Sequence, residues 1–337
     1  MNEELRSELR RCIALGTMEE LEESISAIGP YVSGLAVADT VTVSRLHYYT
    51  DIRVRRGAYR QFHIPKKNGG VRSITAPDGE LKDILLTLAF ILGEIYVPTP
   101  EAMAFVRGRS IVDNASRHVG HNYVLNLDLS DFFTSITAGM VERNLTKIGI
   151  PPFVAKEMAT LCTYPAVVSR RIVNVLPQGA PTSPVLSNIC AMTLDARLEG
   201  LARRFHLTYT RYADDITFSS NHNVYQPDGE FWRELQRIIK ECHFAINPNK
   251  TRLQERGVRQ VVTGLTVCAK PNVSRRYIKN LRAQIHNIKH ESKPSTHEIN
   301  VVRGKLNFLR MVKGKDDPTY VAYLKRLNVA VKGRHFE

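Results

Sequence analysis

The amino-acid sequence predicts an α/β or α+β body followed by a basic, helical C-terminal part. Segments with strand-like alternation are interleaved with segments of helical spacing along most of the 337 residues. Charge is divided unevenly. Residues 251–337 hold 19 Lys/Arg against 6 Asp/Glu, whereas the first 250 residues hold 28 against 27. Nearly all of the net charge of +14 therefore lies in the last quarter, as expected of a surface that contacts a phosphate backbone.

The N-terminal part is expected to be helical. Residues 3–28 place apolar side chains at helical spacing in two short segments, and Gly16 can end the first of them. The segment TMEE, Thr17 to Glu20, has the pattern of a capping box that begins the second helix. This region contains no chemistry of its own and looks structural.

A hairpin and an apolar helix are expected next. Residues 61–77 carry strand-forming apolar side chains on both sides of Asn68-Gly69-Gly70, which is a strong turn signal. Residues 80–96 are predominantly apolar and long enough for a buried helix.

The middle of the chain alternates between the two kinds of element. The expected elements are a strand over 123–133, a helix over 140–150, a Pro/Gly turn and long helix over 176–204, a strand over 210–219 and a helix over 228–244. A strand over 260–268 and a turn over 270–274 follow, and the last 60 residues are expected to be mostly basic helix.

Bulk properties narrow the class of protein. The sequence has no run of eighteen apolar residues, so no membrane span is expected. The first eleven residues are charged and lack an apolar core, so no secretion signal is expected either. Five scattered cysteines without a CxxC pair are expected to be reduced thiols of a cytoplasmic protein.

Three aspartates are the main candidates for chemistry. Asp214 and Asp215 are adjacent within a strand-like segment, and Asp128 follows another strand. Acidic side chains at strand ends can converge, and their mutual repulsion then needs a positive partner such as Mg²⁺. Two such ions can stabilise the attacking and leaving oxygens of a phosphoryl transfer. Two adjacent aspartates alone more often mark a surface turn, but with Asp128 and the basic C-terminal part, metal-dependent phosphoryl chemistry is the better interpretation.

Four sequence blocks resemble a reverse transcriptase. They are IPKKNGGVRSITAP (64–77), NLDLSDFF (126–133), LPQGAPTSPVLSN (176–188) and YADD (212–215), in the order of the family. The resemblance covers roughly residues 45–310. Three further blocks resemble bacterial retron-type enzymes, namely YTDIRVRRGAYRQFHIP (49–65), NASRH (114–118) and VTG (262–264).

The resemblance implies an α+β right-hand polymerase with a helical basic thumb. The implied divisions are an N-terminal helical extension (1–45), fingers (46–120 and 145–170), palm (121–144 and 171–268) and thumb (269–337). Arg275, Arg276, Lys279 and Arg282 would then follow the template–primer backbone as a positive surface.

The resemblance also assigns roles around the aspartates. Asp128, Asp214 and Asp215 resemble the palm ligands of two Mg²⁺ ions, and the carbonyl of Leu129 would complete the shell of one ion. Lys250 resembles the lysine proposed to protonate the leaving pyrophosphate, although a surface lysine is almost as good an interpretation.

Residues for the dNTP substrate are implied in the same way. Lys66 and Arg72 resemble fingers residues that grip the triphosphate, or they are solvated hairpin charges. Phe133 matches the position whose ring rejects a 2′-hydroxyl, or it is a core residue. Gln178 and Gly179 resemble the loop that packs under the nucleotide, where Gly permits close backbone approach.

Four residues of the retron-like blocks are candidates for RNA binding. Asn114 and His118 would share one helix face and are tied by the resemblance to the family's own RNA. The alternative is a helix cap by Asn114 with a packed His118. Thr263 and Gly264 are either RNA contacts or a strand turn.

The implied function is that of a retron's RNA-directed DNA polymerase. Such an enzyme copies part of a cognate structured non-coding RNA into RNA-linked single-stranded DNA (msDNA), in a system that resembles antiphage defence. The DNA product, a separate effector protein and a host ribonuclease H are the expected further partners. The alternatives are another bacterial reverse transcriptase, of the group II intron, diversity-generating or phage-exclusion kind, or an inactive polymerase-fold RNA-binding module. The intact aspartates argue against the last of these.

Overall fold

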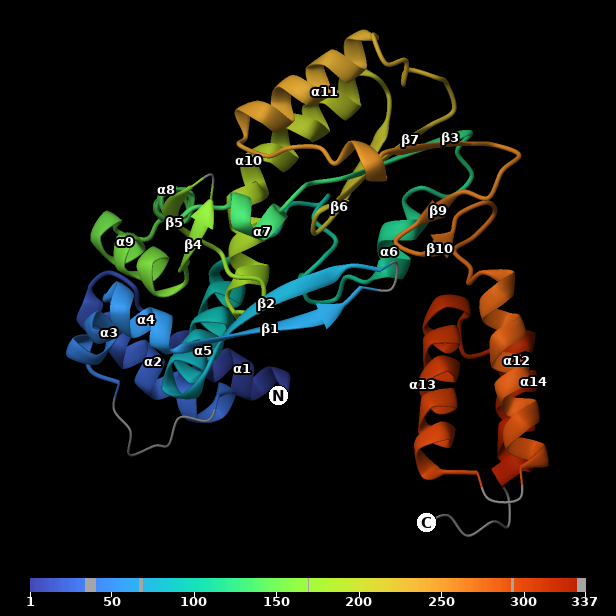
Figure 1. Ribbon diagram of the computed structural model, residues 1–337, viewed down its shortest axis with the longest axis horizontal. Coiled ribbons are helices and arrows are strands. Elements are labelled where there is room, and N and C mark those ends of the chain that lie inside the picture. The colour runs from blue at the N-terminus through green and yellow to red at the C-terminus, as the bar shows by residue number, and fades with distance from the viewer. Residues whose placement is uncertain (34–40, 67–68, 169, 292–293, 332–337) are drawn as a thin grey trace. The chain divides into compact units, whose positions relative to one another are not determined.

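The computed structural model describes residues 1–33, 41–66, 69–168, 170–291 and 294–331 (Figure 1). By their internal contacts these residues form two compact units. Unit 1 comprises Met1–Arg107, Leu129–Glu199 and Glu234–Asn247, and unit 2 comprises Gly108–Asp128, Gly200–Arg233 and Pro248–Glu337. The division into fingers, palm and thumb stays a prediction, and each unit is described by itself.

The N-terminal part of unit 1 contains the three predicted helices, which are α1 (Glu3–Arg11), α2 (Met18–Val32) and α5 (Gly79–Ile95). Two further helices, α3 (Val43–Thr50) and α4 (Ile52–Gly57), were not predicted. The hydroxyl of Thr17 caps α2 by accepting from the Glu20 amide. The return half of the predicted capping box differs, because the Glu20 carboxylate accepts from the amide of Gly16 instead of that of Thr17.

Two antiparallel hairpins belong to unit 1. The first pairs β1 (Tyr59–Pro65) with β2 (Val71–Pro77), as predicted, and Gly69 and Gly70 both have positive φ in its turn. Asn68, the first residue of the predicted turn signal, lies outside the described residues. The second hairpin pairs β4 (Tyr164–Val168) with β5 (Arg171–Val175) and was not predicted.

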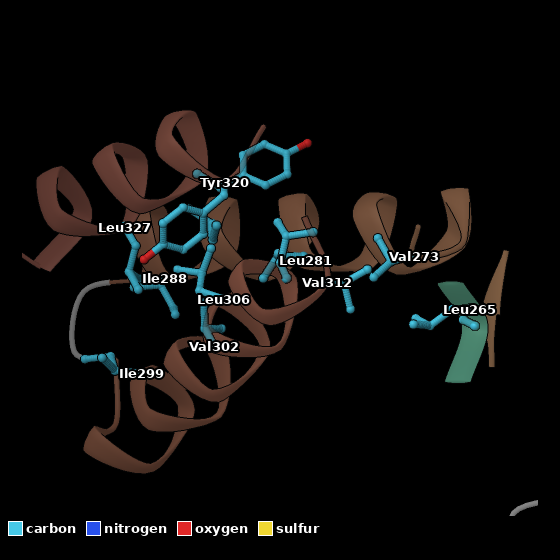
Figure 2. Close-up of a cluster of buried hydrophobic side chains, with 14 of the residues drawn as sticks. Leu265, Val273, Leu281, Ile288, Ile299, Val302, Leu306, Val312, Tyr320 and Leu327 are labelled. Atoms are coloured by element: carbon cyan, nitrogen blue, oxygen red, sulfur yellow. The ribbon is translucent and has the colours of Figure 1, made fainter. Parts of the chain in front are cut away.

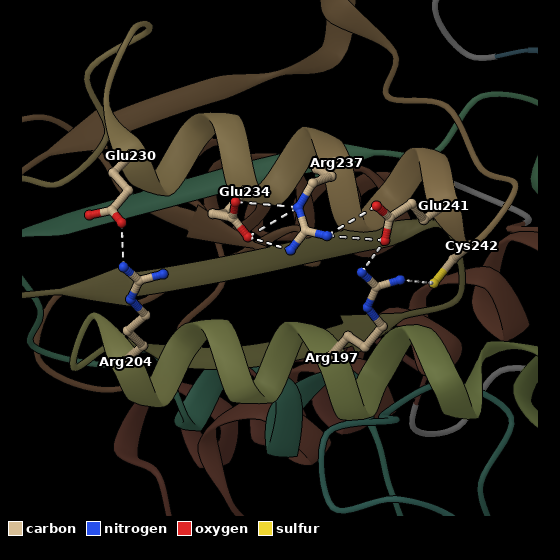
Figure 3. Close-up of polar contacts among 7 residues, drawn as sticks. All are labelled: Arg197, Arg204, Glu230, Glu234, Arg237, Glu241 and Cys242. Carbon is tan, nitrogen blue, oxygen red and sulfur yellow. Dashed lines mark hydrogen bonds and ion pairs between the residues drawn. The ribbon is translucent and has the colours of Figure 1, made fainter.

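Three helices of the central region begin and end close to the predicted positions; they are α8 (Ala138–Lys147), α10 (Ser183–Arg204) and α11 (Glu230–Glu241). Two others, α7 (Phe132–Ser135) and α9 (Pro152–Leu161), were not predicted, and α7 begins within the segment predicted as a strand over 123–133. Figure 3 shows the ion pairs along α10 and α11. Arg237 bonds Glu234 at 2.6 Å and Glu241 at 3.0 Å, and Glu241 also pairs with Arg197. These charges are partly or largely exposed, so each pair adds little stability.

A four-stranded antiparallel sheet forms the centre of unit 2. Its order is β6 (Thr208–Tyr212), β7 (Asp215–Ser220), β3 (Tyr123–Asp128) and β8 (Arg252–Glu255). The prediction of one strand over 210–219 is wrong, because β6 and β7 form a hairpin that turns at Ala213, whose φ is +58°. The predicted strand over 123–133 ends at Asp128.

The segment predicted as a strand over 260–268 is also a hairpin. It consists of β9 (Val261–Val262) and β10 (Leu265–Thr266), joined at Thr263 and Gly264. The short helix α6 (Ile111–Ser116) contacts β6, β9 and β10. A 3-10 turn, η1 (Pro248–Lys250), precedes β8 and contacts β3.

The C-terminal helices of unit 2 pack around a continuous apolar core. They are α12 (Arg275–His290), α13 (Thr296–Lys313) and α14 (Pro318–Val331). Figure 2 shows their buried side chains, including Leu281, Leu306 and Leu327. The same cluster continues into Val124 of β3 and Leu265 of β10. Burial of this apolar face, at about 25 cal/mol per Å², holds the basic helices to the rest of unit 2. None of the described helices is long and apolar enough to cross a membrane.

The cysteines differ in exposure. Cys12 in unit 1 and Cys268 in unit 2 are exposed, whereas Cys162 and Cys190 are buried. Burial raises the pKa of the Cys162 and Cys190 thiols to about 12. The two buried thiols are therefore protonated and unreactive at neutral pH.

Candidate active site

The three aspartates meet at one end of the unit 2 sheet. Asp128 is the last residue of β3 and lies directly opposite Asp215, the first residue of β7, in the antiparallel register. Asp214 lies in the β6–β7 turn, which the left-handed backbone of Ala213 makes tight. The strand register therefore brings all three residues to the same end of the sheet.

Electrostatic coupling within this group is visible in the pKa of Asp215. This pKa is raised to about 6, chiefly by desolvation and further by the charges of Asp214 and Asp128. The Asp215 side chain is nevertheless exposed. Desolvation here reflects the protein packed around the strand end, and water still reaches the carboxylate, which weakens the energetic effect.

Lys250 supplies a positive charge in direct contact with Asp128. Its Nζ donates to Oδ1 of Asp128 at 2.7 Å, and this hydrogen bond is the main cause of its raised pKa. The Lys250 side chain is 60% exposed and that of Asp128 only 9%. An exposed lysine on a flexible stem can follow a phosphate group as well as the carboxylate, so its position suits the predicted role without establishing it.

The donor set fits an open magnesium site better than a closed metal cage. Among the described residues, no group of three or more His, Cys, Asp or Glu side chains is arranged to hold an ion by itself. Mg²⁺ is usually held by one or two carboxylates together with substrate phosphates and water. Asp128 and Asp215, facing each other across two strands, supply hard oxygen ligands of that kind.

The candidates for dNTP binding lie in unit 1. Lys66, which directly follows β1, and Arg72 of β2 are exposed beside the tip of the β1–β2 hairpin, and the amide of Lys66 donates to the carbonyl of Gly70. The carbonyl of Gln178 accepts from the amide of Thr75 in β2 at 2.9 Å. The predicted loop therefore packs against the strand that carries Arg72.

Gly179 is required by this packing. Its φ is +136°, and a Cβ at this position would lie 2.7 Å from Cγ2 of Ile74 and 3.0 Å from the carbonyl oxygen of Thr75. A side chain would push the loop away from β2. The reason for Gly is thus close approach to a strand.

Phe133 and Leu129 follow the Asp128 strand end. Phe133 is half-buried and contacts Phe132 and Phe105, with ring centroids 5.5 and 6.4 Å apart. Leu129 is buried and forms an isolated bridge with Ile246, which fixes its backbone. Both residues belong to unit 1, and their roles toward substrate and metal remain proposals.

Asn114 and His118 are buried, which agrees with only one half of the alternative interpretation made from the sequence. Asn114 is 1% and His118 0% exposed, so neither side chain presents a surface to RNA. The N-cap of α6 is Ser110, which forms a capping box with Asp113, so Asn114 is not the cap. His118 is packed, as the alternative interpretation held, and both of its ring nitrogens are hydrogen-bonded.

The remaining RNA-binding candidates are accessible or at turns. Thr263 and Gly264 form the β9–β10 turn. Exposed basic side chains cover the first two turns of α12; they are Arg275, Arg276, Lys279 and Arg282. Their positive charge is available to a phosphate backbone, and RNA contact at these residues stays a prediction.

A cavity of about 260 Å³ adjoins Asp215 within unit 2. Its lining includes Asn126, Thr217 and Arg252, together with the Thr263–Gly264 turn. Sequence reasoning missed Asn126 and Arg252. The signal was present for Asn126, because residues two apart on a strand share a face and Asn126 precedes Asp128 by two.

The fold and site define a reverse transcriptase. Residues 64–288 match the family described as reverse transcriptase (RNA-dependent DNA polymerase), and the chain belongs to it. The chain is 38% identical over 291 residues to the retron Mx65 reverse transcriptase of Myxococcus xanthus, covering 82% of this chain and 67% of that protein. It is 32% identical to the retron Ec86 reverse transcriptase of Escherichia coli, covering 85% of each. Within the family, it is a bacterial retron-type enzyme.

A likeness among solved structures is more distant. A telomerase of Candida albicans matches 83% of this chain and 57% of its own, with 10% identity and a TM-score of 0.47.

Replacing one site carboxylate is expected to stabilise the metal-free protein. The folded-state pKa of Asp215, about 6, lies above its unfolded value of about 3.9. The Asp215 carboxyl therefore binds its proton more tightly in the folded state than in the unfolded state. Its ionisation lowers the free energy of unfolding as the pH rises from about 4 to 6. Asp215→Asn removes that cost. In EDTA at pH 8 the variant should melt about 2 °C higher than wild type, and at pH 4 the two should coincide.

The measurement is thermal unfolding at both pH values, repeated with Mg²⁺. Added Mg²⁺ should raise the melting temperature of the wild type more than that of the variant. A variant that melts below wild type in EDTA at pH 8 would contradict the repulsion described.

Proposed function

We propose that the chain is the DNA polymerase of a retron. It copies part of a cognate structured non-coding RNA into single-stranded DNA that stays linked to the RNA. The observation that carries this is the opposed Asp128–Asp215 pair, with Asp214 in the adjoining turn, on a chain that belongs to the retron-type reverse transcriptases. A polymerase of this family requires a divalent metal, and we propose two Mg²⁺ ions.

The residues around the aspartates would have separate roles in phosphoryl transfer. When bound, Mg²⁺ supplies positive charge at the attacking and leaving oxygens. Asp128, Asp214 and Asp215 would hold it, with the Leu129 carbonyl. Lys250, now bonded to Asp128, can carry a proton toward the leaving pyrophosphate.

Unit 1 would select and hold the incoming nucleotide. Lys66 and Arg72 at the hairpin tip offer a point charge and a bidentate donor to the triphosphate. The ring of Phe133, which is half-buried, would occupy the space that a ribose 2′-hydroxyl needs. The Gln178–Gly179 loop supports the strand that carries Arg72.

The nucleic acid would lie along the basic surface of α12. Its arginines and lysine are exposed on a helix whose opposite face is anchored in the core of unit 2. Phosphate contacts of this kind give affinity for any RNA, and selection of the cognate RNA then needs contacts to loops and helix shape. We further propose that the protein acts in the cytoplasm in antiphage defence, together with a separate effector protein. A host ribonuclease H would remove the template RNA.

Sequencing the nucleic acid that copurifies with the protein tests this function. The wild type should carry one RNA species covalently joined to single-stranded DNA, complementary to part of that RNA. Protein with Asp214→Asn and Asp215→Asn should carry the same RNA without DNA, because RNA binding does not need the metal site. DNA copied from many unrelated RNAs would contradict retron function and favour another kind of reverse transcriptase.

A further inference from the structure

A left-handed backbone conformation places Phe105 at the surface of unit 1. Its φ is +59°, a value that is costly for a bulky aromatic residue. The three residues before it, 102–104, are buried, whereas the Phe105 side chain is 47% exposed. The chain therefore turns outward at Phe105 and presents an aromatic ring to solvent. Strain of this kind persists where surrounding contacts impose it, and it is concentrated at functional sites.

The residue before Phe105 is anchored by a buried amide. Asn188 of α10 is 0% exposed, and its Nδ2 donates to the carbonyl of Ala104 at 2.8 Å. Asn188 is the last residue of the LPQGAPTSPVLSN block, and neither the aspartates nor the dNTP candidates account for it. A buried amide that lost this bond would leave polar groups unsatisfied, which is unfavourable. The hydrogen bond therefore fixes the chain relative to α10 at the point where it turns outward.

The Phe105 ring is the most exposed of a row of four aromatic rings in unit 1. It lies 6.4 Å from the ring of Phe133, which lies 5.5 Å from that of Phe132, between ring centroids. Phe132 in turn stacks on Phe244 at 5.5 Å. Phe132 and Phe244 are buried, Phe133 is half-buried and Phe105 is exposed. Phe133 thus has one aromatic neighbour in the core and another at the surface, and such ring pairs attract each other.

A half-buried ring can exclude a 2′-hydroxyl only if it is held on its open side as well. Phe133 lies in the short helix α7, where more than one staggered position of χ1 is accessible to an aromatic side chain. Phe132 restricts movement of the Phe133 ring toward the core. Phe105 is the neighbour that restricts movement away from the core. Without Phe105, a ribonucleotide could displace the Phe133 ring instead of being rejected by it.

We infer that Phe105 is a second specificity-determining residue for the sugar of the incoming nucleotide. It keeps the Phe133 ring in the position that excludes a 2′-hydroxyl, and the hydrogen bond from Asn188 to Ala104 keeps Phe105 in place. Phe105 is therefore a positioning residue, which acts on the nucleotide through Phe133. This inference rests on the proposed polymerase function and deepens it.

Two substitutions at Phe105 test the inference, with a DNA primer annealed to an RNA template. Phe105→Ala removes the ring and should raise kcat/KM for GTP about tenfold, with kcat/KM for dGTP and primer–template Kd within about threefold of wild type. Phe105→Tyr keeps the ring and should hold the dGTP/GTP ratio within about twofold of wild type. Equal losses of kcat/KM for both nucleotides in Phe105→Ala would overturn the inference, as would a Phe105→Tyr variant that behaves like Phe105→Ala.

Phe153→Ala is the matched control. Phe153 lies in α9 of unit 1, is 60% exposed and is not one of the four rings of the row. Its replacement removes a comparable exposed aromatic surface, and the dGTP/GTP ratio should stay at the wild-type value. A ratio that falls as far in Phe153→Ala as in Phe105→Ala would overturn the role of Phe105.

A double-mutant cycle tests whether Phe105 acts through Phe133. The dGTP/GTP ratio of Phe105→Ala with Phe133→Ala should match that of Phe133→Ala alone within about twofold, because a ring that is absent cannot be positioned. Independent, multiplying losses would overturn the positioning role. The proposed function is tested separately, by RNA-templated synthesis in the wild type and by Phe133→Ala alone. If both of these behave as proposed and Phe105→Ala leaves the ratio unchanged, this inference alone fails.

Discussion

Changing Asp214→Asn together with Asp215→Asn should abolish RNA-templated DNA synthesis. Asp215 begins β7 opposite Asp128, and Asp214 lies in the turn before it. Their negative charge would hold the metal that neutralises the reacting phosphates. Asparagine keeps the shape of each side chain but removes the charge. We expect incorporation of dNTPs to fall by about a thousandfold or more, as when a preorganised group that stabilises the transition state is lost.

The measurement is steady-state incorporation on an RNA template with Mg²⁺. Thermal unfolding and RNA binding serve as controls, and both should match wild type or improve, because removing two neighbouring negative charges relieves repulsion. Activity within tenfold of wild type would remove the metal assignment.

Replacing Phe133→Ala should weaken the discrimination between deoxyribonucleotides and ribonucleotides. The Phe133 ring is half-buried and supported by Phe132 and Phe105, so its position is fixed while part of it faces outward. Removing the ring opens space for a 2′-hydroxyl. The ratio of kcat/KM for dGTP to that for GTP should fall by about 100-fold, at the upper end of what shape selection by one side chain supplies.

Phe231→Leu is the matched control for this experiment. Phe231 is buried in unit 2, where it packs edge-to-face against Phe218 with centroids 5.3 Å apart. Its loss should lower the melting temperature without changing the dGTP/GTP ratio. If Phe133→Ala behaved in the same way, Phe133 would be a core residue and sugar selection would lie elsewhere.

The elements with local signals could be predicted from the sequence. The capped helices α1 and α2, the apolar helix α5, the β1–β2 hairpin and the basic C-terminal helices appear where spacing and turn residues predict them. Their signals are local because capping, glycine turns and helical spacing act within a few residues.

The β6–β7 hairpin, which carries Asp214 and Asp215, had no such local signal in the sequence. Its turn places Ala213 in a left-handed conformation, which composition alone does not predict for alanine. For this reason the sequence analysis predicted a single strand where the structure has β6 and β7. The β9–β10 turn was missed for the same reason at Thr263, whose conformation is imposed by α6.

Burial of Asn114 and His118 was equally inaccessible to local reasoning. The two side chains lie four residues apart and looked like one exposed helix face. Their partners, Thr210 and Ser219, lie about 90 to 100 residues further along the chain. The two side chains become buried and hydrogen-bonded only because α6 packs on β6. Sequence spacing alone therefore could not decide between direct RNA contact and burial.

The difference in exposure among the cysteines has a practical consequence for following motion. Maleimide or nitroxide reagents attack accessible thiolates, and burial protects Cys162 and Cys190. Cys12 and Cys268 are exposed, one in each compact unit. Cys242 is partly exposed, and Cys242→Ser removes its thiol. The chain then offers one exposed cysteine for labelling in each unit. A pair of spectroscopic probes at Cys12 and Cys268 would then report in real time how the separation of the two units responds to template, primer and nucleotide.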